Sequence, residues 1–556
     1  MKGHSGAILF DGELRDREAQ KSRRNSIPIQ GFDVFLEGFS RALLTRSAHG
    51  PVVFPREALL GSRGSAPTWF ANVTDKIRAT AATDIQALSA WDRLLLLSMG
   101  PEMLQYAWMR AEACRPDWPI TAILHSPQPI PRIRYLFTNN LMGTLGPQDA
   151  LVCPSNAARG VIEAIFAAVP ASLRAAERLP MQLPVIPMGV DVDAMTKISQ
   201  EDARRALDLS GDGPIVLWLG RLSPADKGEM LPFLRSVAPV IERHQARFVI
   251  AGDDTSYRMA DTLRDLATEL GYGDRLIVLP DVTQTEKRQL LRAANIFLAL
   301  SDSMHEGFSL TIAEAMASGL PVIASDWAGH RELIREGYTG RLIPTYLTDD
   351  PTHRVITLYA GAPQEKLWEL STIVDLRALV EALDSMLGAP DLAARMGEAA
   401  LRFARQTLDW AVVIGQYDEL WHDQFARAAR LSVHKDPFPA ATFPKLFATY
   451  PTRFMQPTDL VAVVPHVLGD EYVQALVDTR SFRAEVFSRL LQQCRERPKG
   501  QTVDAIVKAV CRAADGSLQR AEVERHVARL LKHGLLEMVS QTTAPVAPSD
   551  IKTSVD

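Results

Sequence analysis

The chain has 556 residues, which on a prior of roughly 150 residues per domain predicts three or four domains with sizeable cores. Hydrophobic residues make up 47% of it and charged residues 23%, the composition of an ordinary soluble protein. A formal net charge of -5 excludes a general electrostatic attraction to nucleic acid or anionic lipid.

The N-terminus and the cysteines bear on the compartment. The first residues lack the apolar core of a secretory signal, and no apolar run reaches the roughly 20 residues that span a bilayer. The four cysteines are widely scattered, form no CxxC pair and have no histidines at metal-ligand spacing. We therefore expect a cytoplasmic protein whose cysteines are reduced core thiols.

Residues 1–195 are predicted to form a first α/β domain. The charged stretch 11–25 has no apolar period and is expected to be a mobile loop. Phe32, Phe35, Phe39 and Leu43 then recur at helical spacing and predict a helix with a buried face. Short apolar runs predict buried parallel strands at 51–54, 93–99, 120–124, 150–153 and 183–186.

Residues 214–344 alternate strand and helix signals more clearly. Six apolar runs predict strands at 214–220, 246–252, 274–280, 295–300, 320–325 and 339–344. Ser223 with Asp226, and Thr283 with Glu286, have the spacing of capping boxes at helix starts. The alternation predicts a doubly wound parallel sheet, whose ligands bind at the carboxyl ends of the strands.

The segment 301–344 places two carboxylates at a spacing that suits a sugar nucleotide. Glu306 is predicted in a loop, and Glu314 on a helix that begins at the N-cap Ser309 and ends before Gly319. A helix N-terminus favours a diphosphate. Glu314 lies five residues further, about 7.5 Å along the helix, roughly the distance from a diphosphate to the ribose of the same nucleotide.

The whole segment resembles the E-x7-E signature of glycosyltransferase family 4, the retaining enzymes with the GT-B fold. The residues between and after the glutamates match as well, in the stretches EGFSL, EAMASGLPVIAS and GYTGRLIP. The resemblance implies two Rossmann-like doubly wound domains that face a cleft. Residues 1–195 would bind the acceptor, residues 196–385 the nucleotide sugar, and the helices of 386–435 would return to the first domain.

The resemblance also implies roles for cations and glycines after the strand at 214–220. Arg221 and Lys227 would neutralise the diphosphate leaving group, a task that paired cations perform without metal. Gly220 would let the backbone approach the phosphate. The spacing between Arg221 and Lys227 is one residue longer than is commonest in the family, and Lys227 is predicted to begin the next helix.

The remaining donor contacts follow from the same motif. Glu306 and His125 would act at the sugar as catalytic residues, while Glu314 would bind the ribose. The amides of Gly307, Phe308 and Ser309 would approach the donor, although glycine is more usual in the family at the position of Ser309. Asp281 and Val282 are predicted to edge the base.

Other polar residues near these motifs are interpreted as bystanders. His305 and His330 are given no role, and the pair Asp191 and Asp193 lies at the domain hinge, where a metal role is not expected. The sequence contains no Walker A motif and no GxGxxG after a strand, which argues against NTPases and dehydrogenases. No cofactor or metal is expected besides the nucleoside diphosphate sugar.

The last part of the chain is predicted to be separate. A proline-rich linker at 436–459 precedes a mostly helical domain at 460–545, followed by a disordered tail at 546–556. Residues 502–539 have a helix, turn, helix and strand pattern similar to a winged helix. Peptide recognition, a structural or oligomerisation module, and DNA binding all remain open, although interleaved acidic residues disfavour nucleic acid.

The sequence thus predicts a retaining transferase that moves a hexose-type sugar from a nucleoside diphosphate sugar to a glycan, a lipid-linked sugar or a peptide. One alternative with the same fold is a sugar nucleotide epimerase or hydrolase. Another is a non-catalytic scaffold with a peptide-recognition tail, which the joint presence of Arg221, Lys227, Glu306 and Glu314 disfavours.

Overall fold

The computed structural model divides the chain into two compact units, Met1–Pro439 and Ala440–Asp556. The residues that it describes are 7–10, 31–55, 75–80, 88–101, 103–126, 145–168, 179–211, 213–223, 227–255, 257–347, 372–431, 453, 455–464, 482–514 and 518–539. The loop predicted at 11–25, the tail at 546–556 and most of the linker at 436–459 lie outside these ranges. No helix in the described part of the chain is long and apolar enough to cross a membrane.

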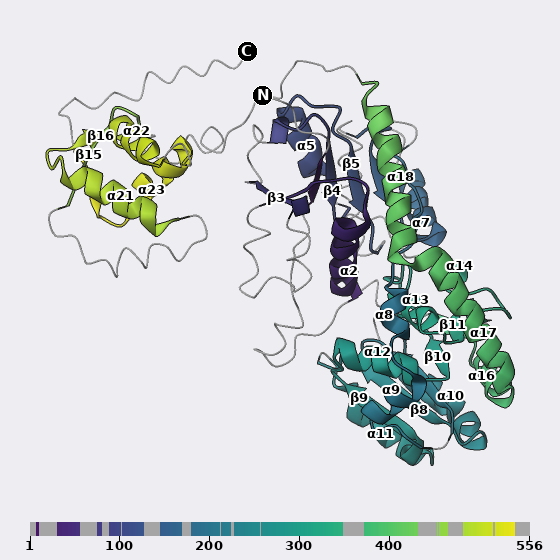
Figure 1. The fold of residues 1–556 in the computed structure, drawn as a ribbon. Coiled ribbons are helices and arrows are strands. Elements are labelled where there is room, and N and C mark those ends of the chain that lie inside the picture. Colours follow the sequence, from purple (N-terminus) through teal and green to yellow (C-terminus); the bar gives the residue numbers. More distant parts are fainter. Residues whose placement is uncertain are drawn as a thin grey trace. The chain divides into compact units, whose positions relative to one another are not determined.

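The first unit contains two six-stranded parallel sheets (Figure 1). The strands of the first sheet, in spatial order, are β3 (Ile77–Thr80), β2 (Val52–Pro55), β1 (Ala7–Phe10), β4 (Leu94–Ser98), β5 (Ile120–Ile123) and β6 (Ala150–Val152). One face is covered by α2 (Gly31–Arg46) and α18 (Trp410–Ala428), and the other by α5 (Leu104–Glu112) and α7 (Asn156–Ala168).

The second sheet has the same architecture. Its strands, in spatial order, are β12 (Gly340–Ile343), β11 (Val322–Ser325), β10 (Ile296–Ala299), β7 (Ile215–Leu219), β8 (Arg247–Gly252) and β9 (Leu276–Pro280). Its flanking helices are α8 (Val192–Thr196), α9 (Gln200–Ala206), α10 (Met230–Arg243), α11 (Met259–Glu269), α12 (Gln284–Ala293), α13 (Leu310–Ala317), α14 (His330–Leu333), α16 (Leu376–Gly388) and α17 (Pro390–Phe403). A short antiparallel pair, β13 (Thr345–Tyr346) and β14 (Ile373–Val374), follows β12.

The two sheets and their helices form the GT-B fold that the sequence predicts. Each sheet is buried on both faces, with one apolar core packed on each face. Continuous apolar runs such as IVLWL in β7 have no exposed face because parallel strands are covered by helices on both sides.

Two adjacent crossings connect the domains. The chain leaves the first domain near Val190 and returns at Asp409, where the two segments pair in parallel, after a π-helical turn at Ala404–Leu408. Val190 N donates to Leu408 O at 2.8 Å, and Trp410 N donates to Val190 O at 3.2 Å. The helix α18 then packs Val413, Tyr417, Trp421 and other side chains into the core of the first domain. The predicted return of the closing helices is therefore present (Figure 1).

Glycines make the crossing close. A Cβ atom on Gly189 would lie 2.3 Å from Trp410 Cε3, and one on Gly38 in α2 would lie 2.9 Å from Trp410 Cζ2. The indole of Trp410 therefore lies directly on the backbone of both segments, which fixes the hinge against the first domain.

The second unit has its own apolar core and is mixed in structure. It contains β15 (Leu460–Val463), α21 (Ala484–Arg495), β16 (Gln501–Thr502), α22 (Val503–Ala513), α23 (Arg520–Lys532) and β17 (Leu536–Met538). The three strands pair antiparallel in the order β16-β15-β17. The helix, turn, helix and strand predicted at 502–539 are confirmed, and the winged-helix assignment stays a prediction.

Most predicted strands are confirmed, with one exception and six omissions. The segment predicted as a strand at 183–186 pairs in parallel with β6 only through isolated bridges at Gln182 and Val185, because Pro184 has no N–H to complete the ladder. The short strands that were not predicted are β1, β3, β13, β14, β15 and β16. All four cysteines are free, and Cys114 and Cys511 are only half-buried rather than core thiols.

Candidate functional site

The candidate donor site lies at the carboxyl edge of the second sheet. Gly220 and Arg221 follow β7, and the loop that contains Glu306 follows its neighbour β10. These two central strands come from different halves of the alternating pattern, so their carboxyl ends bring residues about 80 positions apart into one place. Gly220 N donates to Ala251 O, and Leu222 N donates to Asp253 O, which fixes the turn after β7.

An ion pair joins two of the predicted site residues. Lys227 Nζ donates to Glu306 Oε2 at 2.6 Å, with the Glu306 side chain 9% exposed and that of Lys227 35% exposed. Burial acts to raise the pKa of Glu306, but Lys227 and the nearby His330 outweigh burial, so this pKa lies below its ordinary value. The site therefore holds a carboxylate and an ammonium in contact.

The structure corrects the expected setting of Lys227. The next helix, α10, begins at Met230 rather than at Lys227. Gly228 separates the two with φ of +111°, and a Cβ there would lie 2.7 Å from Leu300 O. Lys227 is thus in a turn that lies against the end of β10, and this brings its ammonium to Glu306. The capping box predicted at Ser223 and Asp226 is not described, because Asp226 lies outside the described residues.

His330, which was predicted to be a bystander, lies close enough to Glu306 to help lower the pKa of its carboxyl group. It is fully buried at the start of α14, and its Nδ1 lies 3.1 Å from Ser325 O. Burial lowers the pKa of His330, and Glu306 only partly opposes this effect. Because α14 follows β11, the neighbour of β10, the carboxyl-end loops of the two strands meet. A search for polar residues after adjacent strands would have found this histidine.

The start of α13 differs from the sequence prediction in its capping. Ser309 is at the N-cap position, but its side chain makes no capping hydrogen bond, and its φ is +89°. Its Oγ lies instead 3.3 Å from Thr311 Oγ1. Left-handed backbone favours glycine, so the family's glycine at this position has a conformational reason. The Phe308 side chain is buried in the core, which leaves the backbone of this loop as its polar surface.

The first domain contacts this donor loop directly. Ser155 Oγ donates to Gly307 O at 2.6 Å. The backbone N–H groups of Asn156 and Ala157, at the start of α7, donate to the Glu332 carboxylate at 2.9 and 3.0 Å. Glu332 on α14 therefore satisfies the N-terminus of a helix in the other domain, a position that favours a negative charge.

Glu314 lies on α13 and is almost fully buried. Its Oε1 accepts a hydrogen bond from Lys287 Nζ at 2.6 Å. Its Oε2 has no hydrogen-bond partner among the described residues. Lys287 belongs to α12, whose first turn is fixed by the predicted capping box of Thr283 and Glu286, which the structure confirms.

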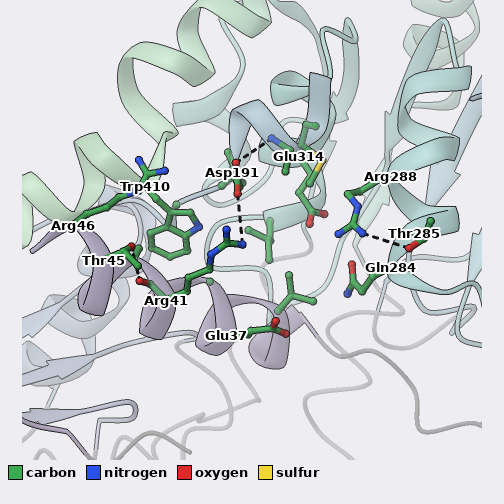
Figure 2. A pocket seen from close by; sticks show the side chains of 18 of the residues that line it. Glu37, Arg41, Thr45, Arg46, Asp191, Gln284, Thr285, Arg288, Glu314 and Trp410 are labelled. Carbon is green, nitrogen blue, oxygen red and sulfur yellow. Dashed lines mark hydrogen bonds and ion pairs between the residues drawn. The ribbon is translucent and has the colours of Figure 1, made fainter. Parts of the chain in front are cut away.

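Glu314 is part of the wall of a cavity of about 730 Å³ between the two domains (Figure 2). The second domain contributes α13 and the first turns of α12, including Gln284, Thr285 and Arg288. The first domain contributes one face of α2, including Glu37 and Arg41, and Trp410 of α18. Figure 2 shows Arg41 directed toward Asp191, with which it forms an ion pair at 4.0 Å. Neither Glu306 nor Lys227 lines this cavity.

His125 follows β5 at the carboxyl edge of the first sheet, as predicted. Its Nε2 lies 2.9 Å from Met99 O, and its ring packs edge-on against Phe35 of α2 with centroids 4.9 Å apart. These contacts hold the ring in one orientation.

The predicted base edge follows the outermost strand, β9. Asp281 has φ of +57°, and its N–H donates to Gly252 O at 2.7 Å, while Val282 packs on the core. Neither lines the cavity, although the next residue, Thr283, does.

The described residues contain no group of three or more His, Cys, Asp and Glu side chains that could hold a metal ion. The aspartates at the hinge have other partners. Asp191 caps α8 by accepting from Ala194 N at 3.0 Å, and Asp193 pairs with Arg405 at 3.5 Å.

Comparison with known proteins shows what the second domain is similar to. Residues 199–369 match the family model described as glycosyl transferases group 1. The fold of the first unit is similar to a glycosyltransferase from Rickettsia africae ESF-5, with a TM-score of 0.50 and 14% identity. That comparison covers 78% of this chain and all of the Rickettsia chain, and it shows the fold alone.

Among curated proteins, the chain is similar to enzymes named D-inositol 3-phosphate glycosyltransferase. It is 32% identical over 186 residues to the one from Mycobacterium sp. (strain JLS), which is 33% of this chain and 41% of that protein. It is 34% identical over 200 residues to the one from Mycobacterium leprae (strain Br4923), which is 35% of this chain and 45% of that protein. The chain thus spans less than half the length of both curated relatives.

Proposed function

We propose that the chain is a retaining glycosyltransferase of family 4 that transfers a hexose-type sugar from a nucleoside diphosphate sugar. The observation that carries the proposal is the Lys227–Glu306 pair at the carboxyl edge of the second sheet, beside the start of α13. The buried Glu314 on the same helix supports it, since one of its carboxylate oxygens has no hydrogen-bond partner in the part of the chain that the structure describes. The similarity of residues 199–369 to group 1 glycosyl transferases agrees with this assignment.

In the proposed reaction the bond between the anomeric carbon and the diphosphate oxygen breaks, and the acceptor hydroxyl forms a new bond on the same face. The proton of that hydroxyl goes to an oxygen of the departing diphosphate. Arg221, Lys227 and the backbone of Gly307 to Ser309 stabilise the negative charge that develops. Glu306 and His125 contact the sugar, and Glu306 gives up its pairing with Lys227 when the diphosphate arrives. Retention rests on the resemblance to family 4.

We propose that no metal takes part, because the groups placed to receive the diphosphate are cations. Metal independence is tested by turnover in excess EDTA, which we expect to leave the rate unchanged. Loss of activity that added Mg²⁺ or Mn²⁺ restores would contradict this part of the proposal.

The acceptor is proposed only by class. The curated relatives carry inositol 3-phosphate in their name, so phosphorylated polyols belong in an acceptor panel with glycans, lipid-linked sugars and peptides. Residues 460–545 are proposed to recruit a peptide or protein acceptor, with a purely structural role as the alternative.

A donor panel scored by release of the nucleoside diphosphate tests the function. UDP-, GDP- and ADP-linked hexoses would be offered with the acceptor panel, and the anomeric configuration of the product would be read by NMR. Transfer with retention supports the proposal. Release of a free sugar nucleotide epimer, or hydrolysis with every acceptor, would favour an epimerase or hydrolase instead. Absence of binding to every donor would favour the scaffold.

A further inference from the structure

A buried cation lies behind the predicted ribose contact. Glu314 is 2% exposed and lines the cavity, whereas Lys287 is 8% exposed and does not line it. The two are joined at 2.6 Å through Lys287 Nζ and Glu314 Oε1. The carboxylate therefore separates the ammonium from the cavity, and Lys287 can act on a ligand there only through Glu314.

This ion pair is incomplete in its hydrogen bonding. Burying two charges is costly, and the attraction between them offsets the cost only when the remaining lone pairs are also satisfied. Glu314 Oε2 is buried and has no hydrogen-bond partner among the described residues. A buried carboxylate oxygen of this kind calls for a donor, and the cavity is the space from which one can come.

The position of Lys287 is set by the start of α12. Thr283 Oγ1 accepts from Glu286 N at 3.2 Å, and Glu286 Oε2 accepts from Thr283 N at 2.7 Å. Lys287 N then donates to Thr283 O at 2.8 Å as the helix continues. The capping box occupies the exposed face of the first turn, so the next residue, Lys287, is held on the buried face toward α13.

We propose that Lys287 is a positioning residue for nucleotide recognition. It occupies Glu314 Oε1 and holds this side chain in place, so that Oε2 accepts a hydrogen bond from a ribose hydroxyl of the donor. The inference rests on the proposed function, and it deepens that function by naming what gives the site its preference for a ribonucleoside.

Losing Lys287 would leave an uncompensated buried carboxylate, which is costly. Glu314 would then turn away from the cavity, and its Oε2 would no longer be placed to accept a hydrogen bond from a hydroxyl. The loss should fall on ligands that carry ribose hydroxyls and spare those that lack them. A general loosening of the fold would weaken both kinds of ligand alike.

The test is a binding cycle on the full chain. UDP, GDP and ADP, and their counterparts that lack both ribose hydroxyls, would be titrated calorimetrically into the wild type, Lys287→Met, Glu314→Gln and the double variant. A hydrogen bond to a charged group implies that the wild type prefers the ribonucleotide by about 10- to 100-fold. Lys287→Met should remove most of that preference, and the double variant should bind no more weakly than Glu314→Gln alone.

Two further variants separate positioning from folding. Lys287→Arg keeps the charge and should restore part of the preference. Arg292→Met removes the hydrogen bonds that Arg292 donates to Ile198 O and Ser318 O at the far end of the same helix, lowers its stability and should leave the preference intact. If Lys287→Met does not fold, the comparison of Glu314→Gln with the double variant still decides the question.

Three results would overturn the proposal. Equal weakening of the ribonucleotide and its hydroxyl-free counterpart in Lys287→Met would mean that Lys287 only packs α12 on α13. A double variant that binds much more weakly than Glu314→Gln would show that Lys287 acts by another route. Failure of the wild type to bind any of the nucleotides would instead remove the proposed function itself, and this inference with it.

Discussion

At the scale of single residues, the ammonium of Lys227 has two partners that compete for it, the Glu306 carboxylate and the diphosphate of the donor. In the structure Lys227 donates to Glu306 at 2.6 Å, while the proposed reaction needs the same ammonium at the diphosphate. A charge-assisted hydrogen bond to a phosphate is strong enough to replace one to a carboxylate. Binding of the donor and release of Glu306 are therefore coupled steps.

This coupling predicts opposite effects of two substitutions. Lys227→Met should weaken binding of the nucleoside diphosphate by about tenfold, because it removes a charged contact. Glu306→Gln should bind the diphosphate as tightly as the wild type or more tightly, since Lys227 is released, yet turn over about 100-fold more slowly. Calorimetric Kd values and steady-state rates would check both. Weaker diphosphate binding in Glu306→Gln would contradict the coupling.

The buried His330 predicts a pH dependence of stability. Its pKa is lowered in the folded protein, so below about pH 6.5 the unfolded chain takes up a proton at this position before the folded one does. The free energy of unfolding should fall as the pH decreases below 6.5. The lowered pKa of Glu306 adds a loss only at lower pH, below the ordinary carboxyl range.

His330→Asn keeps a donor for Ser325 O and removes the titrating ring. The free energy of unfolding, measured with urea, should differ less between pH 5.5 and pH 7.5 in this variant than in the wild type. The exposed His305 offers a matched control, and His305→Asn should leave the difference as it is in the wild type. An unchanged difference in His330→Asn would show that other groups cause the pH dependence.

At the scale of elements, the hinge depends on glycine as much as on the tryptophan that it contacts. A Cβ atom added to Gly189 would lie 2.3 Å from Trp410 Cε3, so an alanine at this position requires the indole or the backbone to move. Gly415, on the same helix as Trp410, has open space around it.

Alanine at these two glycines should therefore have opposite effects. Gly189→Ala should lower the free energy of unfolding by about 1 to 3 kcal/mol through overpacking. Gly415→Ala should raise it by about 0.5 to 1 kcal/mol, because alanine is the better helix former. Chemical denaturation of both variants measures these two changes in the free energy of unfolding. A neutral Gly189→Ala would mean that the crossing is looser than its contacts imply.

Elements also show how far the sequence alone reaches. The strands β7 to β11 were predictable because each contains an uninterrupted apolar run between turn residues. The edge strand β3 was not, because its sequence IRAT has no apolar run, and its alternation of apolar and polar residues extends over only four residues. The turn at Lys227 depends on the close approach of Gly228 to Leu300 O, which no local pattern records.

The candidate site was predictable as a set of motif residues and not as a set of contacts. Arg221, Lys227, Glu306 and Glu314 follow from the resemblance to family 4. The Lys287–Glu314 pair joins two helices, and the approach of His330 to Glu306 joins the loops of two strands. Both arise from the lateral order of the sheet, which single-sequence patterns do not give.

At the scale of the whole molecule, the division into two units suggests a division of labour. The predicted donor residues all lie within Met1–Pro439, and the second unit has a separate apolar core. A unit with its own core is expected to fold by itself.

Truncation tests this division. A chain ending at residue 439 should bind the nucleoside diphosphate with unchanged affinity, and ligand at about 100 times its Kd should still stabilise it by roughly 2.7 kcal/mol. If residues 460–545 recruit the acceptor, the acceptor-dependent rate should fall while donor hydrolysis persists. Loss of donor binding on truncation would show that the second unit is needed for the fold of the first.

The return of α18 has a consequence for how the chain is made. The core of the first domain contains side chains of β1, α2 and β4, and also Trp410, Tyr417 and Trp421 from the far side of the second domain in sequence. During synthesis, which proceeds from the N-terminus, the first domain must wait for α18, and the second domain has by then left the ribosome. The first domain is therefore the later of the two to complete its core. Residues 1–195 expressed alone would expose to solvent the apolar side chains that α18 covers in the full chain.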